Sequence, residues 1–237
     1  MTLNVMTFNI QHGIDYKKKI GQIKEYCIDL DLMANVIKQL DADVCGLNEI
    51  YSICEGEVSA QTEKLGAKTN MNGIFGLAAL IRGKKPYGNA VLSKSPIIKS
   101  EVTPIPVPNE NQEPRSVLRC ELANGLVVYQ THFGLSPEDV TLAADTVFSL
   151  FENEQKPAIL MGDFNITPDN PVLLRLYNNP DITATDIFIK DKLSFPSIDP
   201  TKKIDYIFAN KKVKVLNADI PDIVASDHRP VIACIEF

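Results

Sequence analysis

Two strand–helix–strand units repeat along the chain, and this pattern constrains the fold more than any other feature of the sequence. Each unit opens with a strand pattern, continues with apolar residues at helical spacing, and closes with a short apolar run that meets polar residues. The first unit comprises residues 3–10, 30–40 and 43–49, and the second comprises residues 126–132, 136–152 and 158–163. Such alternation favours an α/β sandwich in which polar residues from several strand ends gather at one edge.

Turn and capping signals divide the remaining sequence. Ser136-Pro137 is typical of a helix N-cap followed by proline in the first turn. Four prolines in residues 104–114 forbid a helix or a central strand, so this segment is predicted to be an extended surface loop. The polar segment 51–73 is predicted to be a helix or an ordered loop. Further strands are predicted at residues 75–81, 89–92, 116–122, 204–209, 213–216 and 231–237.

The length of 237 residues fits one compact domain over residues 1–237. The 24 Lys and Arg residues against 30 Asp and Glu residues give a net charge of −6. A duplex-binding domain that neutralises many phosphates usually has a basic excess, so this balance disfavours a nucleic-acid partner. The same balance suits an acidic metal site.

Cysteine usage and hydropathy indicate the compartment. The five cysteines are an odd number without metal-ligand spacing, and Cys45, Cys120 and Cys234 lie in apolar runs, as small core residues do. A reducing, cytoplasmic location is therefore expected. The first residues form a strand pattern without a charged leader, and no apolar run approaches the roughly 20 residues of a membrane span. No pattern indicates an oligomeric state.

Carboxylates and amides at predicted strand ends are the first candidate site residues. Glu49 ends the apolar run ADVCGLN, where its charge would lie at the edge of the core. Asp163 and Asn165 in MGDFN are two residues apart, so both side chains would share one face of an extended segment. Each of these residues could equally belong to an ordinary turn, where Gly, Asp and Asn are common. Oxygen donors of this kind suit Mg²⁺.

Histidines at strand exits are the second group of candidates. The chain has three, His12, His132 and His228, and each follows a predicted strand. A single histidine is more often a satisfied buried group, but three in equivalent places favour a shared site. Asp227-His228 precedes the last strand, and Asp205 is the natural carboxylate to orient the His228 imidazole.

Two further polar residues complete the set. Asn9 ends the first strand and could coordinate a cation, orient a carboxylate or donate to phosphate. Arg115 follows the proline-rich segment and could bind phosphate oxygens through its forked guanidinium. A surface salt bridge is an equally good explanation for this arginine.

Eight short motifs stand in order along the chain: TFNIQHG, NEI, YGNAVLSKSPI, EPRSVLRCEL, THF, GDFN, IDYIF and SDHRPV. Together they closely resemble the endonuclease/exonuclease/phosphatase superfamily, which includes deoxyribonuclease I, neutral sphingomyelinases, inositol polyphosphate 5-phosphatases and deadenylases. The resemblance extends from Asn4 to the C-terminus. Each motif is short, but eight in order are specific.

The resemblance implies a four-layer α/β/β/α sandwich of two mostly antiparallel sheets, with the site where the sheets meet. It implies a Mg²⁺ ion, with Mn²⁺ as a substitute, surrounded by Asn9, Glu49 and Asp227. The catalytic residues by motif match are Asp163, which would align or deprotonate the attacking water, together with Asn165, the Asp205–His228 pair and His132. The residues expected nearer the substrate are Asn89, Arg115 and His12.

The motifs also narrow the function. His132, and Ile50-Tyr51-Ser52 after Glu49, look unlike the apurinic endonuclease branch and more like the phosphodiesterase and lipid-phosphatase branches. We therefore expect a Mg²⁺-dependent hydrolase of a small or lipid phosphodiester. One alternative is a nuclease whose nucleic-acid path would be lined by loop lysines, namely Lys17–Lys19, Lys84-Lys85 and Lys202-Lys203. A second alternative is a catalytically silent binding module, since one scaffold hosts many functions.

Overall fold

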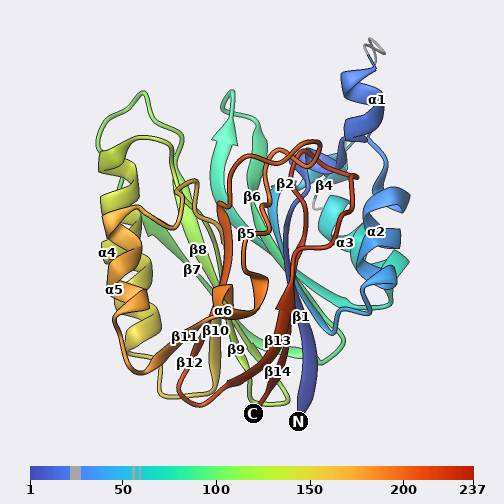
Figure 1. The fold of residues 1–237 in the computed structure, drawn as a ribbon. Helices are drawn as coiled ribbons and strands as arrows, with labels where there is room; N and C mark the ends of the chain where they lie inside the picture. Colours follow the sequence, from blue (N-terminus) through green and yellow to red (C-terminus); the bar gives the residue numbers. More distant parts are fainter. Residues whose placement is uncertain (22–27, 55–56, 59) are drawn as a thin grey trace.

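Two six-stranded sheets packed face to face form the centre of the computed structural model, which describes residues 1–21, 28–54, 57–58 and 60–237 (Figure 1). The first sheet has the order β13-β14-β1-β2-β6-β5, and the second has the order β11-β12-β10-β9-β8-β7. The strands of the first sheet are β1 (Thr2–Asn9), β2 (Val44–Tyr51), β5 (Asn72–Ile81), β6 (Lys85–Ser93), β13 (Lys214–Asp219) and β14 (Val231–Glu236). Those of the second are β7 (Ile97–Ile105), β8 (Arg115–Leu122), β9 (Val127–His132), β10 (Ala158–Asp163), β11 (Ile182–Ala184) and β12 (Asp205–Asn210).

Helices cover the outer face of each sheet, which gives the four layers implied by the family resemblance (Figure 1). On the first sheet lie α2 (Leu30–Gln39) and α3 (Ala60–Thr69), and on the second lie α4 (Pro137–Glu152) and α5 (Leu174–Tyr177). The shorter elements are η1 (Gln11–Gly13), α1 (Tyr16–Ile20), η2 (Pro171–Leu173), α6 (Asp186–Ile189) and a hairpin of β3 (Ile53–Cys54) with β4 (Glu57–Val58). None of the helices within the described residues is long and apolar enough to cross a membrane.

The helix α4 shows how local sequence sets these layers. Ser136 caps its first turn in a capping box with Asp139, and Pro137 occupies the first helical position, as the sequence predicted. Val140, Ala144 and Val147 recur at helical spacing and are buried against the second sheet. Burial of this apolar stripe, rather than helix propensity, holds the helix in place.

The repeated strand–helix–strand pattern is confirmed. In the first sheet β1 pairs with β2 in parallel, and in the second β9 pairs with β10 in parallel, while every other pairing in the two sheets is antiparallel. Parallel strands end at the same edge, so Asn9 lies opposite Asn48 and Asp163 lies opposite His132. Because the sheets pack face to face, both edges bring their polar ends to one place.

Among the boundaries that differ from the prediction, two have a clear physical cause. The segment predicted as a loop from residue 104 begins two residues late, because Pro104 and Ile105 end strand β7 at the edge of the second sheet. Proline is tolerated at an edge, and the exposed strand β7 lacks the apolar alternation that would have revealed it. Strand β2 continues past Glu49 to Tyr51 through a bulge, so Glu49 lies within a strand rather than at its end.

One of the predicted lysine loops is wrong, and a second lies in a loop but has one buried lysine. Lys17–Lys19 lie in the helix α1, and Lys203 is buried, with its Nζ 2.7 Å from Asp186 Oδ1 and 3.6 Å above the Tyr206 ring. Such a lysine is part of the core and cannot line a nucleic-acid path. Cys45 and Cys120 are buried free thiols, as expected, whereas Cys234 is only partly buried.

Candidate active site

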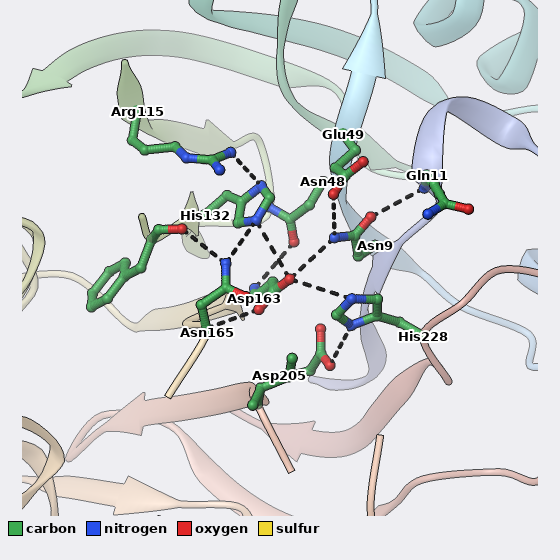
Figure 2. Close-up of polar contacts among 12 residues, drawn as sticks. Asn9, Gln11, Asn48, Glu49, Arg115, His132, Asp163, Asn165, Asp205 and His228 are labelled. Atoms are coloured by element: carbon green, nitrogen blue, oxygen red, sulfur yellow. Dashed lines mark hydrogen bonds and ion pairs between the residues drawn. The ribbon is translucent and has the colours of Figure 1, made fainter. Parts of the chain in front are cut away.

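The carboxylate of Asp163 lies at the centre of a polar cluster where the two sheets meet (Figure 2). It is 1 % exposed, and its Oδ2 accepts a hydrogen bond of 3.1 Å from Asn9 Nδ2. The same oxygen lies 3.5 Å from His132 Nε2 and 3.6 Å from His228 Nε2. Its Oδ1 accepts a 2.9 Å hydrogen bond from the backbone N–H of Asn165. Both oxygens are thus oriented by residues from three separate strand ends.

A close approach of two strands fixes the position of Asp163. Gly162 has φ of 149°, and a Cβ at this position would lie 1.9 Å from the backbone oxygen of Thr131. Only glycine lets β10 come this near to β9. The next residue, Asp163, is consequently drawn into the junction between the sheets.

His228 and Asp205 form a buried pair beside this carboxylate. His228 Nδ1 lies 2.9 Å from Asp205 Oδ2, and both side chains are almost fully buried. Burial alone would lower the pKa of His228, but the charges of Asp205 and Asp163 outweigh it and raise the pKa to about 10. The imidazole is therefore protonated at neutral pH, and its Nε2–H faces Asp163.

The pKa of His132 is shifted in the opposite direction from that of His228. Burial lowers its pKa well below the usual range, and the positive charge of Arg115 lowers it further. Arg115 Nη1 lies 2.9 Å from His132 Nδ1 and can only donate, so Nδ1 accepts and the proton of the neutral ring lies on Nε2. This N–H faces Asp163. Asn165 Nδ2 lies 3.1 Å from the same nitrogen and donates to the Phe133 carbonyl at 2.9 Å.

Glu49 approaches from the other sheet on a strained backbone. The bulge in β2 places this residue at φ of 59°, an uncommon conformation for a side chain other than glycine. Its Oε1 accepts a 3.1 Å hydrogen bond from Asn9 Nδ2, so one amide joins Glu49 to Asp163. His12 Nε2 lies 3.6 Å from Glu49 Oε2, and the His12 ring stacks on Tyr51. The Glu49 side chain is 23 % exposed and remains open to solvent.

Asp227 completes the acidic side of the site. Its Oδ2 accepts from Gln11 Nε2, and its Oδ1 accepts from the Ser226 hydroxyl at 3.0 Å. Burial raises the pKa of the Asp227 carboxyl; the His228 charge lowers it, and the Glu49 charge raises it further. A recess of about 460 Å³ opens above these groups, with its polar lining formed by Glu49, Arg115, His132, Asp163, Asn165, Lys202, Asp227 and His228.

A buried amide network lies under the recess. Asn48 Nδ2 donates to Asn89 Oδ1 and to the Thr131 carbonyl, each at 2.8 Å. Asn48 Oδ1 accepts from Gln130 Nε2 at 2.9 Å and from the Asp163 N–H at 3.2 Å. Asn89, expected near the substrate, is instead buried here, and its Nδ2 donates to a backbone carbonyl of β8. The network ties β2 to β9 and β10.

Three further residues contribute to this site and were not predicted from the sequence: Asn48, Gln130 and Gln11. One signal pointed to Gln130, because it is the polar residue within the apolar run VVYQ and therefore required a buried partner. Of the residues that were predicted, the structure gathers seven in the recess and sets Asn9 and Asp205 directly against them. His12 lies beside Glu49 in a neighbouring recess, and Asn89 lies beneath the site.

The comparisons with known proteins agree with this architecture. The model of the Endonuclease/Exonuclease/phosphatase family matches residues 6–228. Comparison with curated protein sequences gave no match.

Several solved structures share the fold. The endonuclease/exonuclease/phosphatase of Beutenbergia cavernae is 22 % identical, with a TM-score of 0.76 over 100 % of this chain and 72 % of that one. The mannosyl-6-phosphatase of Bacteroides thetaiotaomicron is 15 % identical, with a TM-score of 0.77 over 99 % of this chain and 100 % of that one. The human Nocturnin catalytic domain with bound sulfate is 14 % identical, with a TM-score of 0.71 over 100 % and 93 %. The chain thus belongs to the Endonuclease/Exonuclease/phosphatase family, and it is a phosphoric ester hydrolase.

Proposed function

We propose that the protein is a divalent-metal-dependent phosphodiesterase that hydrolyses a small or lipid phosphodiester by in-line attack of water. One observation carries the proposal: a buried carboxylate, Asp163, faces one amide and the Nε2 atoms of two histidines at the floor of an open recess. A base, a fixed cation and a neutral donor around one point suit attack on phosphorus with charge developing on its oxygens.

Each of these groups has a separate task in the proposed reaction. Burial raises the pKa of Asp163, which makes its carboxylate a better acceptor for the proton of the attacking water. Protonated His228, oriented by Asp205, would stabilise negative charge on a phosphoryl oxygen. Neutral His132 would donate from Nε2, and Asn165 would keep Asp163 aligned through its backbone N–H.

The acidic side of the recess fits a hard cation. Glu49 and Asp227 are two carboxylates that line one recess, and the charge of Glu49 raises the pKa of Asp227. Mg²⁺ or Mn²⁺ prefers such oxygen donors together with waters and a substrate phosphate. Bound there, the cation would act as a Lewis acid on the phosphoryl oxygens. Asn9 fits a holding role, since its Oδ1 accepts the Gln11 N–H at 3.1 Å and its Nδ2 donates to Glu49 and to Asp163.

A second cluster has ligand-type atoms within 4.8 Å of one another, in Asp163, Asp205 and His228. We assign this cluster to proton and charge chemistry instead. His228 already bonds Asp205 through Nδ1 and faces Asp163 through Nε2, so a cation there would compete with a protonated imidazole.

The diester preference rests on two recesses that flank the site. One, of about 660 Å³, lies on the side of Glu49 and His12, and another, of about 350 Å³, lies on the side of Asn165 and Leu135. A phosphodiester has a substituent on each side of phosphorus, whereas a monoester has one. Leu135, which is 79 % exposed, offers an apolar surface beside the second recess.

Hydrolysis of bis-p-nitrophenyl phosphate and p-nitrophenyl phosphate, with Mg²⁺, with Mn²⁺ and with EDTA, tests the proposal. We expect EDTA-sensitive turnover that favours the diester and disappears in Asp163→Ala. The matched control is Asp145→Ala, an exposed carboxylate on α4. Turnover that resists EDTA, or that survives in Asp163→Ala, would contradict the mechanism, and a preference for the monoester would contradict the substrate class.

We also propose a reducing, cytoplasmic location, because Cys45 and Cys120 are buried free thiols. Imaging of the tagged full-length chain tests this expectation.

A further inference from the structure

The larger recess beside the site, next to Glu49 and His12, is lined by aromatic and cationic side chains that breaking an ester bond does not itself require. It shares Glu49 with the site and holds about 660 Å³, enough for a group much larger than a nitrophenyl ring. Part of its lining is aromatic: His12 stacks on Tyr51 with ring centroids 4.1 Å apart, and the buried Tyr87 supports His12 from behind the recess, edge-on at 5.8 Å. His12 also binds Glu49, so this part of the lining is continuous with the site.

The opposite rim of this recess is cationic. Four of its lining residues carry a positive charge: Lys19 from α1, and Arg82, Lys84 and Lys85 from the β5–β6 hairpin. Within the part of the chain that the structure describes, Arg82, Lys84 and Lys85 have no carboxylate within 4 Å. Lys19 donates to Gln11, the same amide that holds Asp227. In a chain of net charge −6, cations gathered without acidic partners are suited to an anionic ligand.

The geometry of in-line displacement indicates which part of the substrate lies in this recess. Asn9 Nδ2 bridges Asp163 and Glu49, so Glu49 and its recess lie across Asn9 from Asp163. In-line displacement requires the leaving group opposite the attacking water. Water on the Asp163 side therefore directs the leaving oxygen toward Glu49 and the cationic rim.

We infer that the leaving group of the substrate carries a second phosphoryl group, which binds Arg82, Lys84 and Lys85 while its body lies along His12 and Tyr51. This inference rests on the proposed function and names its substrate class. Water adds to the reacting phosphorus and gives a proton to Asp163. The P–O bond to the leaving group breaks, and the departing oxygen keeps the bonding electron pair, takes a proton from solvent and leaves with its own phosphate still attached. The second phosphoryl group contributes binding and takes no part in bond breaking.

Binding of a matched ligand pair tests the inference without requiring turnover. Titration calorimetry with Mg²⁺ compares adenosine 3′,5′-bisphosphate with adenosine 5′-monophosphate, in the full chain carrying Asp163→Asn to prevent hydrolysis. We expect the bisphosphate to bind about 10-fold or more tightly, as one partly exposed charged contact provides. Adding Lys84→Ala and Lys85→Ala should remove that advantage and leave monophosphate binding unchanged.

The control is the Lys211→Ala/Lys212→Ala variant, which removes the same charge from an exposed lysine pair outside this recess. Equal affinities for the two ligands, or loss of the advantage in the control variant as well, would overturn the inference. Loss of binding to a single-stranded oligonucleotide in Lys84→Ala/Lys85→Ala, with the bisphosphate unaffected, would overturn it in favour of a nucleic-acid path. Hydrolysis of bis-p-nitrophenyl phosphate by the unsubstituted chain tests the proposed function separately, so failure of the inference is distinct from failure of the proposed function.

Discussion

The two strand–helix–strand halves of the molecule share one arrangement, but each presents a carboxylate in a different environment. In the first half the strand β2 presents Glu49, whose side chain is 23 % exposed to solvent. In the second half the strand β10 presents Asp163, which is almost fully buried and surrounded by hydrogen-bond partners. The same topology thus yields one carboxylate suited to a hydrated cation and one suited to accepting a proton.

A single backbone feature beside each carboxylate produces this difference. In β2 a bulge places Glu49 in the left-handed region and directs it outward. In β10 the close approach at Gly162 draws Asp163 inward against β9. Burial then sets the chemistry, because a desolvated carboxylate favours its protonated form more than an exposed one does.

The largest effect we expect is the loss of the buried carboxylate. Asp163→Asn keeps the side-chain volume but removes the proton acceptor, so kcat for bis-p-nitrophenyl phosphate should fall by roughly 10³-fold, within the range for general bases. The unfolding free energy should stay the same or rise, because a desolvated charge is removed. Urea denaturation monitored alongside kinetics checks both. Asp145→Asn serves as the exposed control. A stable variant with near-normal kcat would show that the two halves do not differ in this way.

Substitution of His228 and His132, the two histidines that face Asp163, tests the surroundings of the buried carboxylate. His228→Ala should lower kcat by roughly 10²-fold or more, since it removes a buried cation, and His132→Ala should lower it less. Asp205→Asn tests the cause. Because the Asp205 charge raises the pKa of His228, the neutral substitute should lower that pKa and move the alkaline limb of the pH–rate profile to lower pH.

Steady-state rates from pH 6 to pH 10 measure this shift. An alkaline limb that stays in place in Asp205→Asn, or moves to higher pH, would show that a different group loses its proton there. Asp169→Asn, an exposed carboxylate, controls for the change in net charge.

A substitution where the two sheets meet should have an effect of intermediate size, on the free energy of unfolding. A Cβ on Gly46 would lie 1.9 Å from Gln130 Oε1 and 2.7 Å from the Met161 methyl group, so both buried side chains would have to leave their positions between the sheets. Gly46→Ala should therefore lower the free energy of unfolding by about 1–3 kcal/mol. In Gly21→Ala, where the nearest atoms lie at ordinary distances, the change should be much smaller. Similar urea midpoints for both variants would show that the junction is not tightly packed.

The smallest expected effect concerns Glu49, the less buried of the two carboxylates. Glu49→Gln should raise the Mg²⁺ concentration for half-maximal activity by roughly 10-fold, because one charged ligand of a hydrated cation becomes neutral. Saturating Mg²⁺ should restore much of the rate. Glu110→Gln, on an exposed loop, is the control. If Mg²⁺ dependence were unchanged in Glu49→Gln but weakened in Asp163→Asn, the roles of the two halves would be reversed.

The sequence predicted more of the fold than of the geometry of the site. Periodicity and the Ser136 cap identified the repeated units, because burial of an apolar face imposes a regular spacing. The exposed strand β7 was missed because its side chains bury little and so carry no such spacing. Most of the residues named at predicted strand ends lie together in the structure, yet their burial could not be read from their identity. Asp163 and Glu49 are both acids, and only the bulge and the glycine contact separate them. Lys203, similarly, is of a residue type that usually lies at the surface, yet its side chain is buried in the core.

The amide network beneath the site has a consequence for how the molecule loses activity. Asn48 and Gln130 bond across the junction, so the recess cannot open locally unless the two sheets come apart. Backbone amides at these strand ends should therefore exchange with solvent deuterium only through global unfolding, and heat inactivation should coincide with the melting of the whole domain. Changes in the surrounding loops would then alter which ester is accepted while the reaction centre keeps its rigidity.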